Sequence, residues 1–163
     1  MSHARLPRIG AAAGVIGPLL FAAVTLTLTI LQYSFMRSLG WDPLSRPTFD
    51  WPSGLALGPL GELMTITFIV SGILLSVFVW GLRTELRDTN GQISTILLTW
   101  AVVAMMGLAF TTDRTLSLMP STWHGRLHDL SFMALGLLLI PAMILCAISF
   151  RRTNSWNRLS LLT

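Results

Sequence analysis

The chain has 163 residues, of which 53% are hydrophobic and 11% are charged, and its mean hydropathy is +0.69. Because a soluble domain carries about 25% charged residues, this composition excludes an ordinary water-soluble domain and predicts an integral membrane protein. The net charge of only +4, without an arginine-rich stripe, argues against nucleic-acid binding, and the single cysteine, Cys146, excludes an intramolecular disulfide framework.

Four apolar stretches are long enough to cross a bilayer, which takes about 20 residues of helix. The expected spans cover residues 9–31, 60–82, 93–110 and 127–150. The first span continues beyond the length of a signal-peptide core without a cleavage motif, so we expect it to be a retained anchor. Pro141 lies inside the fourth span and predicts a kink there.

These stretches predict an all-α fold, a transmembrane bundle of four helices in which residues 1–163 form a single integral membrane domain. Glycines stand in the middle of three spans, where small residues allow helices to approach closely. They are Gly72, Gly107 and Gly136. None of the three belongs to a G-x-x-x-G pair, so the packing face stays open.

The distribution of arginine predicts that both termini lie in the cytoplasm of the cell membrane. Seven arginines fall on the side of the termini and four on the other side. The acids Asp42, Asp50, Glu62, Asp113 and Asp129 and the tryptophans Trp41, Trp51 and Trp123 fall on the outer side. Any chemistry is therefore expected at the outer face.

The sharpest local pattern is His124-Gly125-Arg126-Leu127-His128-Asp129, at the entry to the fourth span. The two histidines are four residues apart and share one helix face, the spacing that lets two imidazoles hold one metal ion. Asp113 would supply a third ligand or orient an imidazole. His124, His128 and Asp113 are therefore a candidate zinc site, with Glu62 as a possible base. Asp129 and Asp42 complete the polar cluster at this face.

A second interpretation needs no metal. The histidines would form hydrogen bonds with loop carbonyls, with Asp113 or with water, and Ser121 or Thr122 would cap the fourth helix. Asp113 follows the third helix, where a carboxylate opposes the helix dipole, so it needs a partner such as Arg114, Arg126 or a protonated histidine.

Haem is not favoured, because a six-coordinate haem needs a ligand on each face of the ring. His124 and His128 share one helix, and His3 lies on the opposite side of the membrane. The loop Trp41–Pro47, which includes Asp42, is interpreted either as a lid over the bundle or as a segment whose tryptophan lies among the lipid headgroups.

The order of four short motifs resembles domain-of-unknown-function family 998. The motifs are Gly14–Leu19 (GVIGPL), Trp41–Ser45 (WDPLS), Gly58–Gly61 (GPLG), and Thr112-Asp113 followed by His124-Gly125-x-x-His128. The resemblance covers nearly the whole chain and implies a polytopic membrane protein of a bacterium or archaeon, without an established activity. It also implies that relatives continue into further helices after this point.

Two functions remain open. In the first, the protein is a non-enzymatic subunit, lipid-handling component or transport accessory, whose partners are the lipid bilayer and either a second copy or another membrane protein. In the second, the His/Asp cluster binds zinc and activates water against a lipid or headgroup substrate. Nothing in the sequence demands a catalyst, so we favour the first.

Overall fold

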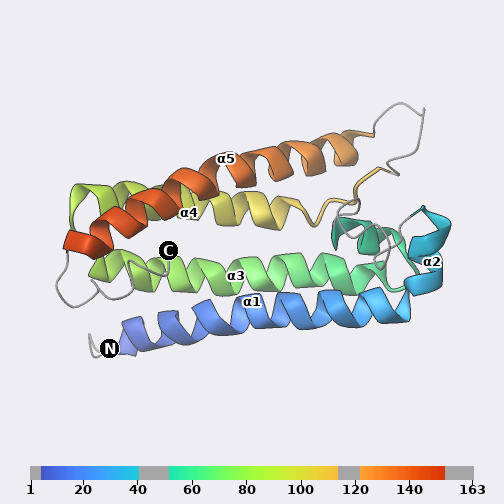
Figure 1. Cartoon of the computed structure of the whole chain (residues 1–163), viewed down its shortest axis with the longest axis horizontal. Coiled ribbons are helices and arrows are strands. Elements are labelled where there is room, and N and C mark those ends of the chain that lie inside the picture. Colours follow the sequence, from blue (N-terminus) through green and yellow to red (C-terminus); the bar gives the residue numbers. More distant parts are fainter. Residues whose placement is uncertain (1–4, 41–51, 114–121, 153–163) are drawn as a thin grey trace.

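The computed structural model describes residues 5–40, 52–113 and 122–152. Every regular element within these residues is a helix, which confirms the all-α prediction. The order is α1 (Arg5–Leu31), α2 (Tyr33–Ser38), the 3-10 helix η1 (Pro52–Leu57), α3 (Gly61–Glu85), α4 (Thr89–Gly107) and α5 (Trp123–Arg152). The four long helices run side by side along one axis (Figure 1).

Three helices are long and apolar enough to cross a membrane, namely α1, α3 and α5, so the chain is a helical membrane protein. Helix α4, with 19 residues, is long enough but falls short of the same standard of hydropathy, because its first four residues, Thr89 to Gln92, are polar or glycine. It also begins four residues before the predicted span and ends at Gly107 instead of residue 110. Four spans are thus not established by helix length and composition alone.

The long helices pack as two pairs, α1 along α3 and α4 along α5, and α3 joins the pairs through its contact with α4. Figure 1 shows the pairs as two layers. Apolar side chains of α3, α4 and α5 form one core near the turn between α3 and α4. Side chains from α1, α2, η1, α3 and residue 108 form a second core at the opposite end.

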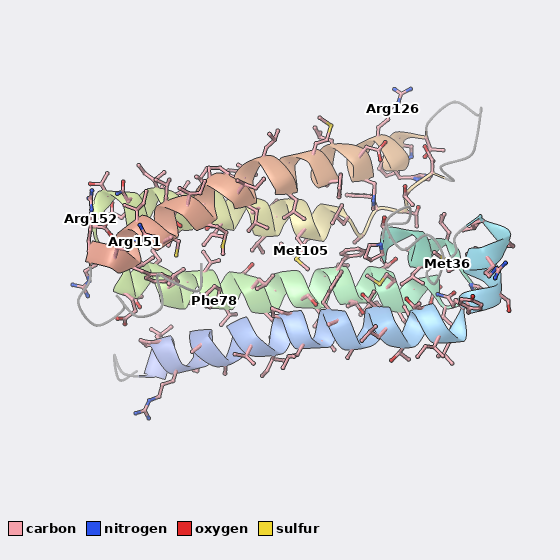
Figure 2. The ribbon with its side chains drawn as sticks, in the orientation of Figure 1. Met36, Phe78, Met105, Arg126, Arg151 and Arg152 are labelled. Atoms are coloured by element: carbon pink, nitrogen blue, oxygen red, sulfur yellow. The ribbon has the colours of Figure 1, made fainter. Side chains whose placement is uncertain are left out.

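Glycines of α1 set its packing against α3. A β-carbon at Gly10 would lie 3.0 Å from the Cα of Gly81, and one at Gly14 would lie 2.5 Å from the Phe78 ring, which points toward α1 in Figure 2. Gly10 and Gly14 form a G-x-x-x-G pair, a spacing that lets helix backbones approach closely in membranes. The sequence analysis could not assign a packing face from the mid-span glycines. For α1 and α3, that face is determined by Gly10 and Gly14 of the first span.

The register of α4 against α5 determines where the polar residues meet. The two helices run antiparallel, with Gly107 beside Ser131, Ser94 donating a hydrogen bond to the Ala142 carbonyl (2.8 Å), and Ser149 donating to Asp88. Because α5 has 30 residues and α4 only 19, the first two turns of α5 extend beyond the end of α4. They lie beside residues 108–113, which are not helical apart from a turn at 108–109.

Candidate functional site

The backbone after α4 leaves its helical hydrogen-bond pattern close to the membrane. The N–H groups of Leu108, Ala109 and Phe110 still bond to carbonyls three residues back, at 3.0–3.1 Å. The carbonyls of Phe110 and Thr111 receive no such helical bond. Because unsatisfied backbone groups are costly at membrane depth, these two carbonyls need other donors.

Two histidines of α5 supply those donors. His128 Nδ1 lies 2.7 Å from the Phe110 carbonyl oxygen, and His124 Nδ1 lies 3.1 Å from that of Thr111. A carbonyl oxygen only accepts, so each Nδ1 carries the hydrogen and donates it. His128 itself is buried, with 4% of its surface exposed, and its bond to Phe110 is partly buried. The two imidazoles are therefore oriented by the carbonyls of consecutive residues.

Thr122 caps α5 and links it to Asp113. Its hydroxyl oxygen accepts from the Gly125 N–H at 3.1 Å, which confirms Thr122 as the N-cap. The hydroxyl donates to Asp113 Oδ1 at 2.5 Å, and the Thr122 backbone N–H donates to Asp113 Oδ2 at 2.8 Å. Since the only hydroxyl hydrogen goes to the carboxylate, the 3.0 Å contact between Thr122 Oγ1 and His124 Nδ1 again makes Nδ1 the donor.

Asp113 has the partner that its position requires. The two bonds from Thr122, the hydroxyl bond first, hold the pKa of this carboxyl below its usual value of 3.8, and the charges of His124 and Arg126 act in the same direction. Although Asp113 follows α4, its carboxylate lies against the first turn of α5, where the helix dipole favours a negative charge. The predicted conflict with the α4 dipole is offset by this second helix.

We call Phe110, Thr111, Asp113, Thr122, His124 and His128 the α4–α5 cluster. Trp123 lies beside it: its ring meets the Phe110 ring edge to face with centroids 5.9 Å apart, and it meets the His124 ring at 5.7 Å. Trp123 is 68% exposed. This exposure is typical of a tryptophan at the membrane–water interface.

The predicted three-ligand metal site is not found in this geometry. Within residues 5–40, 52–113 and 122–152, no three histidine, cysteine, aspartate or glutamate side chains are grouped so that they could hold a metal ion. The physical reason is that both carboxylate oxygens of Asp113 accept hydrogen bonds from Thr122. The structure does bring His124 and Asp113 together, but through the Thr122 hydroxyl that both contact.

The other predicted residues lie apart from the cluster or outside the described chain. Glu62 is exposed in the first turn of α3, and Asp129 is exposed on α5. Asp42 and the predicted lid Trp41–Pro47 lie outside the described residues, as does His3.

Gln32 is a buried polar residue that the sequence analysis did not single out. It is 3% exposed and separates α1 from α2. Its Nε2 donates to the Leu55 carbonyl at 3.1 Å, and its Oε1 accepts from the Leu60 N–H at 2.9 Å. A β-carbon at Gly58 would lie only 2.0 Å from that Oε1. A glutamine at the end of an apolar span, before a Gly-Pro motif, is the signal that could have found this contact.

Comparison with known proteins matches the chain to a protein family. A family model described as "Protein of unknown function (DUF998)" matches residues 15–163, a range that contains the whole α4–α5 cluster and Gln32. No curated protein and no solved structure matches the chain significantly.

Proposed function

The chain belongs to the DUF998 family, and from this premise we propose that it is a non-enzymatic protein with four membrane spans. Its role is that of a subunit or accessory component of a prokaryotic cell membrane, with both termini in the cytoplasm. In this proposal the α4–α5 cluster is a structural joint that fixes the outer ends of two spans.

One observation carries the structural role. Each polar side chain of the α4–α5 cluster forms hydrogen bonds with the backbone or with another member of the cluster. His124 and His128 donate from Nδ1 to the carbonyls of Thr111 and Phe110, and the Asp113 oxygens accept from Thr122. A catalytic nucleophile needs a base within hydrogen-bond reach. The Thr122 hydroxyl donates its hydrogen to Asp113, but it is also the acceptor that caps α5, which makes it a poor nucleophile.

Helix α4 is the fourth span in this proposal. Its 19 residues extend about 28 Å at 1.5 Å per residue, close to the roughly 30 Å of a hydrocarbon core. It packs along α5 and also on α3, two helices that are apolar enough to span. The arginines agree with the orientation, since Arg151 and Arg152 lie at one end of the bundle and Arg126 at the other (Figure 2).

Impermeable-maleimide labelling of intact cells tests the topology. In a Cys146→Ser background, Arg87→Cys lies between α3 and α4, and Thr112→Cys lies between α4 and α5. We expect labelling from outside at residue 112 and none at residue 87 until the membrane is permeabilised. Labelling of both or of neither in intact cells would show that α4 does not cross, and labelling only at residue 87 would reverse the orientation.

A second candidate function is the zinc-dependent hydrolase, and one observation favours it. Histidines that bind metals through Nε2 commonly donate Nδ1–H to a backbone carbonyl, which is how His124 and His128 are held. Water or a substrate group would have to complete the coordination, because Asp113 is engaged by Thr122.

Elemental mass spectrometry of the purified chain, beside a His124→Ala/His128→Ala variant, separates the two functions. The structural joint predicts no stoichiometric metal in either protein and a lower thermal stability of the variant. About one zinc per chain that is lost in the variant would replace the structural proposal with the metal site and justify a screen for lipid hydrolysis.

A further inference from the structure

Positive charge gathers at the end of the bundle that carries the turn between α3 and α4. Four exposed arginines lie on the last turn of α3, on the turn that follows it and on the last turn of α5: Arg83, Arg87, Arg151 and Arg152. Within the described residues none of the four forms an ion pair with an acid. Two acids share this end, Glu85 and Asp88, so the arginines leave a surplus of positive charge.

One hydrogen bond brings the arginines of different elements together. Ser149 donates to Asp88, which joins the last turn of α5 to the turn between α3 and α4. Arg87 is the residue before Asp88, and Arg151 follows Ser149 by two residues, so both lie at the same edge of the bundle. Figure 2 shows Arg151 and Arg152 at this end. Because the second carboxylate oxygen of Asp88 is buried, that acid is directed into the protein and not toward the arginines.

The arginines keep hydrogen-bond donors for an anion. Arg87 donates from Nε to the Thr84 carbonyl at 3.3 Å, which uses one of the five N–H groups of a guanidinium. The remaining groups form the planar fork that binds a phosphate through two parallel hydrogen bonds.

Apolar side chains that face the lipid lead up to the arginines on both elements. On α5, Ile140 and Ile144, which are 65% and 57% exposed, share one helix face with Arg151. On α3, Trp80 is 61% exposed and lies one turn before Arg83, at the depth where tryptophans meet lipid headgroups. The surface therefore offers a path for acyl chains that ends at donors for a phosphate.

We propose that this end of the bundle binds an anionic phospholipid. Its phosphate lies against Arg87, Arg151 and Arg152, and an acyl chain lies along Ile140 and Ile144. Basic groups between helices at the membrane surface bind such headgroups, whereas the headgroup of phosphatidylcholine carries a positive charge that the arginines repel.

The opposite end of the bundle has no such surplus of positive charge. Its described residues carry three acids and two arginines, and both arginines, Arg37 and Arg126, already have an interaction within the chain. The inference depends on the helices that span the membrane, but not on which end faces the cytoplasm, so the topology experiment and the lipid experiment can fail independently.

Native mass spectrometry of the full chain in a neutral detergent tests the proposal. Dioleoyl phosphatidylglycerol and dioleoyl phosphatidylcholine are titrated separately, and we expect the chain to bind the anionic lipid more tightly. From the usual contribution of an arginine near an anionic membrane surface, Arg87→Gln should weaken this binding about fivefold and Arg151→Gln/Arg152→Gln about thirtyfold. Arg37→Gln/Arg126→Gln removes the same charge as the double variant at the opposite end and should bind like the wild type.

Three outcomes would overturn the proposal. Equal affinity of the wild type for both lipids would show that the arginines select no anion. An equal loss in Arg37→Gln/Arg126→Gln would show attraction by net charge alone, and an unchanged affinity in Arg87→Gln would show that the two elements share no site.

Competition by glycerol phosphate distinguishes a lipid from a soluble phosphate. We expect no displacement of phosphatidylglycerol, because the soluble compound lacks the acyl chains that lie along Ile140 and Ile144. Displacement would show that the arginines bind a free phosphate, and the lipid proposal would fail. Thermal unfolding should give the same Tm for wild type, Arg87→Gln and Arg151→Gln/Arg152→Gln, since the replaced arginines are exposed.

Discussion

The Asp113 carboxylate occupies the space that a side chain at Gly125 would need, since a β-carbon at residue 125 would lie 2.2 Å from Asp113 Oδ2. The two residues belong to motifs twelve positions apart in the sequence, Thr112-Asp113 and His124-Gly125. The structure joins them in one contact, in which the carboxylate reaches the Thr122 N–H only because residue 125 has no side chain.

The first prediction concerns Gly125→Ala, which should destabilise the protein by about 1–3 kcal/mol, the usual cost of overpacking. The added methyl group displaces the carboxylate from Thr122. Gly136→Ala on the same helix is the control, because its β-carbon meets nothing and alanine favours the helix. Thermal unfolding in detergent should show a lower Tm only for Gly125→Ala; equal Tm values would contradict the contact.

The second prediction concerns the two roles of the Thr122 hydroxyl. Thr122→Val removes the helix cap and the donor to Asp113, and the loss of a cap alone costs about 1 kcal/mol. Thr122→Ser keeps both bonds and should unfold close to the wild-type temperature. If serine and valine lower the Tm equally, shape rather than the hydroxyl is what matters at this position.

The third prediction is a stability loss in acid. The pKa of Asp113 is lower in the folded protein than its usual value of 3.8, so the unfolded chain takes up the proton first as the pH falls. The stabilisation by Asp113 is therefore fully present above that usual value and is lost as the pH falls through the lower folded-state pKa. Unfolding curves of the wild type and Asp113→Asn between pH 3 and 7 should converge at the acid end. Parallel curves would argue against the bonds from Thr122.

The fourth prediction concerns the hydrogen bond from the buried His128 side chain to the Phe110 carbonyl. His128→Phe keeps an aromatic ring but leaves the carbonyl without its donor, at a cost of about 1–3 kcal/mol. Nitrogen-15 labelling should also show that the wild-type ring carries its hydrogen on Nδ1 while neutral. A neutral ring with the hydrogen on Nε2 would contradict the assigned bond.

The fifth prediction concerns Gln32→Leu, which removes the donor to Leu55 and the acceptor for Leu60 at once. Two backbone groups, the buried Leu55 carbonyl and the partly buried Leu60 N–H, lose their partner. The Tm should therefore fall further than for His128→Phe, in which only one backbone group loses its partner. Exposed Ser38, whose hydroxyl donates to the Phe35 carbonyl within its own helix, gives the control Ser38→Ala, with little change expected.

The helical class and three of the spans could be predicted from the sequence because long apolar runs have few other stable forms in a membrane. The limits of α4 could not, because the predicted span began with the first apolar residue, Ile93. The helix instead starts at Thr89, where the tight turn after α3 directs the chain back. The G-x-x-x-G pair of α1 was visible in the sequence, but only the structure shows that it meets Gly81.

For the site, the sequence analysis grouped His124, His128 and Asp113, but it did not predict that both Asp113 oxygens accept hydrogen bonds from Thr122. Spacing along a helix places His124 and His128 on one face, and a cap at Ser121 or Thr122 was expected from their position before an apolar run; the structure identifies Thr122. No spacing rule says whether Asp113 meets an imidazole or the cap, since that depends on how residues 108–113 fold against α5. The donors for the Phe110 and Thr111 carbonyls could not be predicted either. They are available only because the first turns of α5 extend beyond the end of α4.

That early end of α4 has a consequence for biosynthesis. The donors for the Phe110 and Thr111 carbonyls come from His124 and His128, which leave the ribosome after α4 has been made. Until then this backbone has only water or the translocon as a partner. We therefore expect α4 and α5 to enter the bilayer together as a hairpin, whereas α1 and α3 are apolar enough to enter singly.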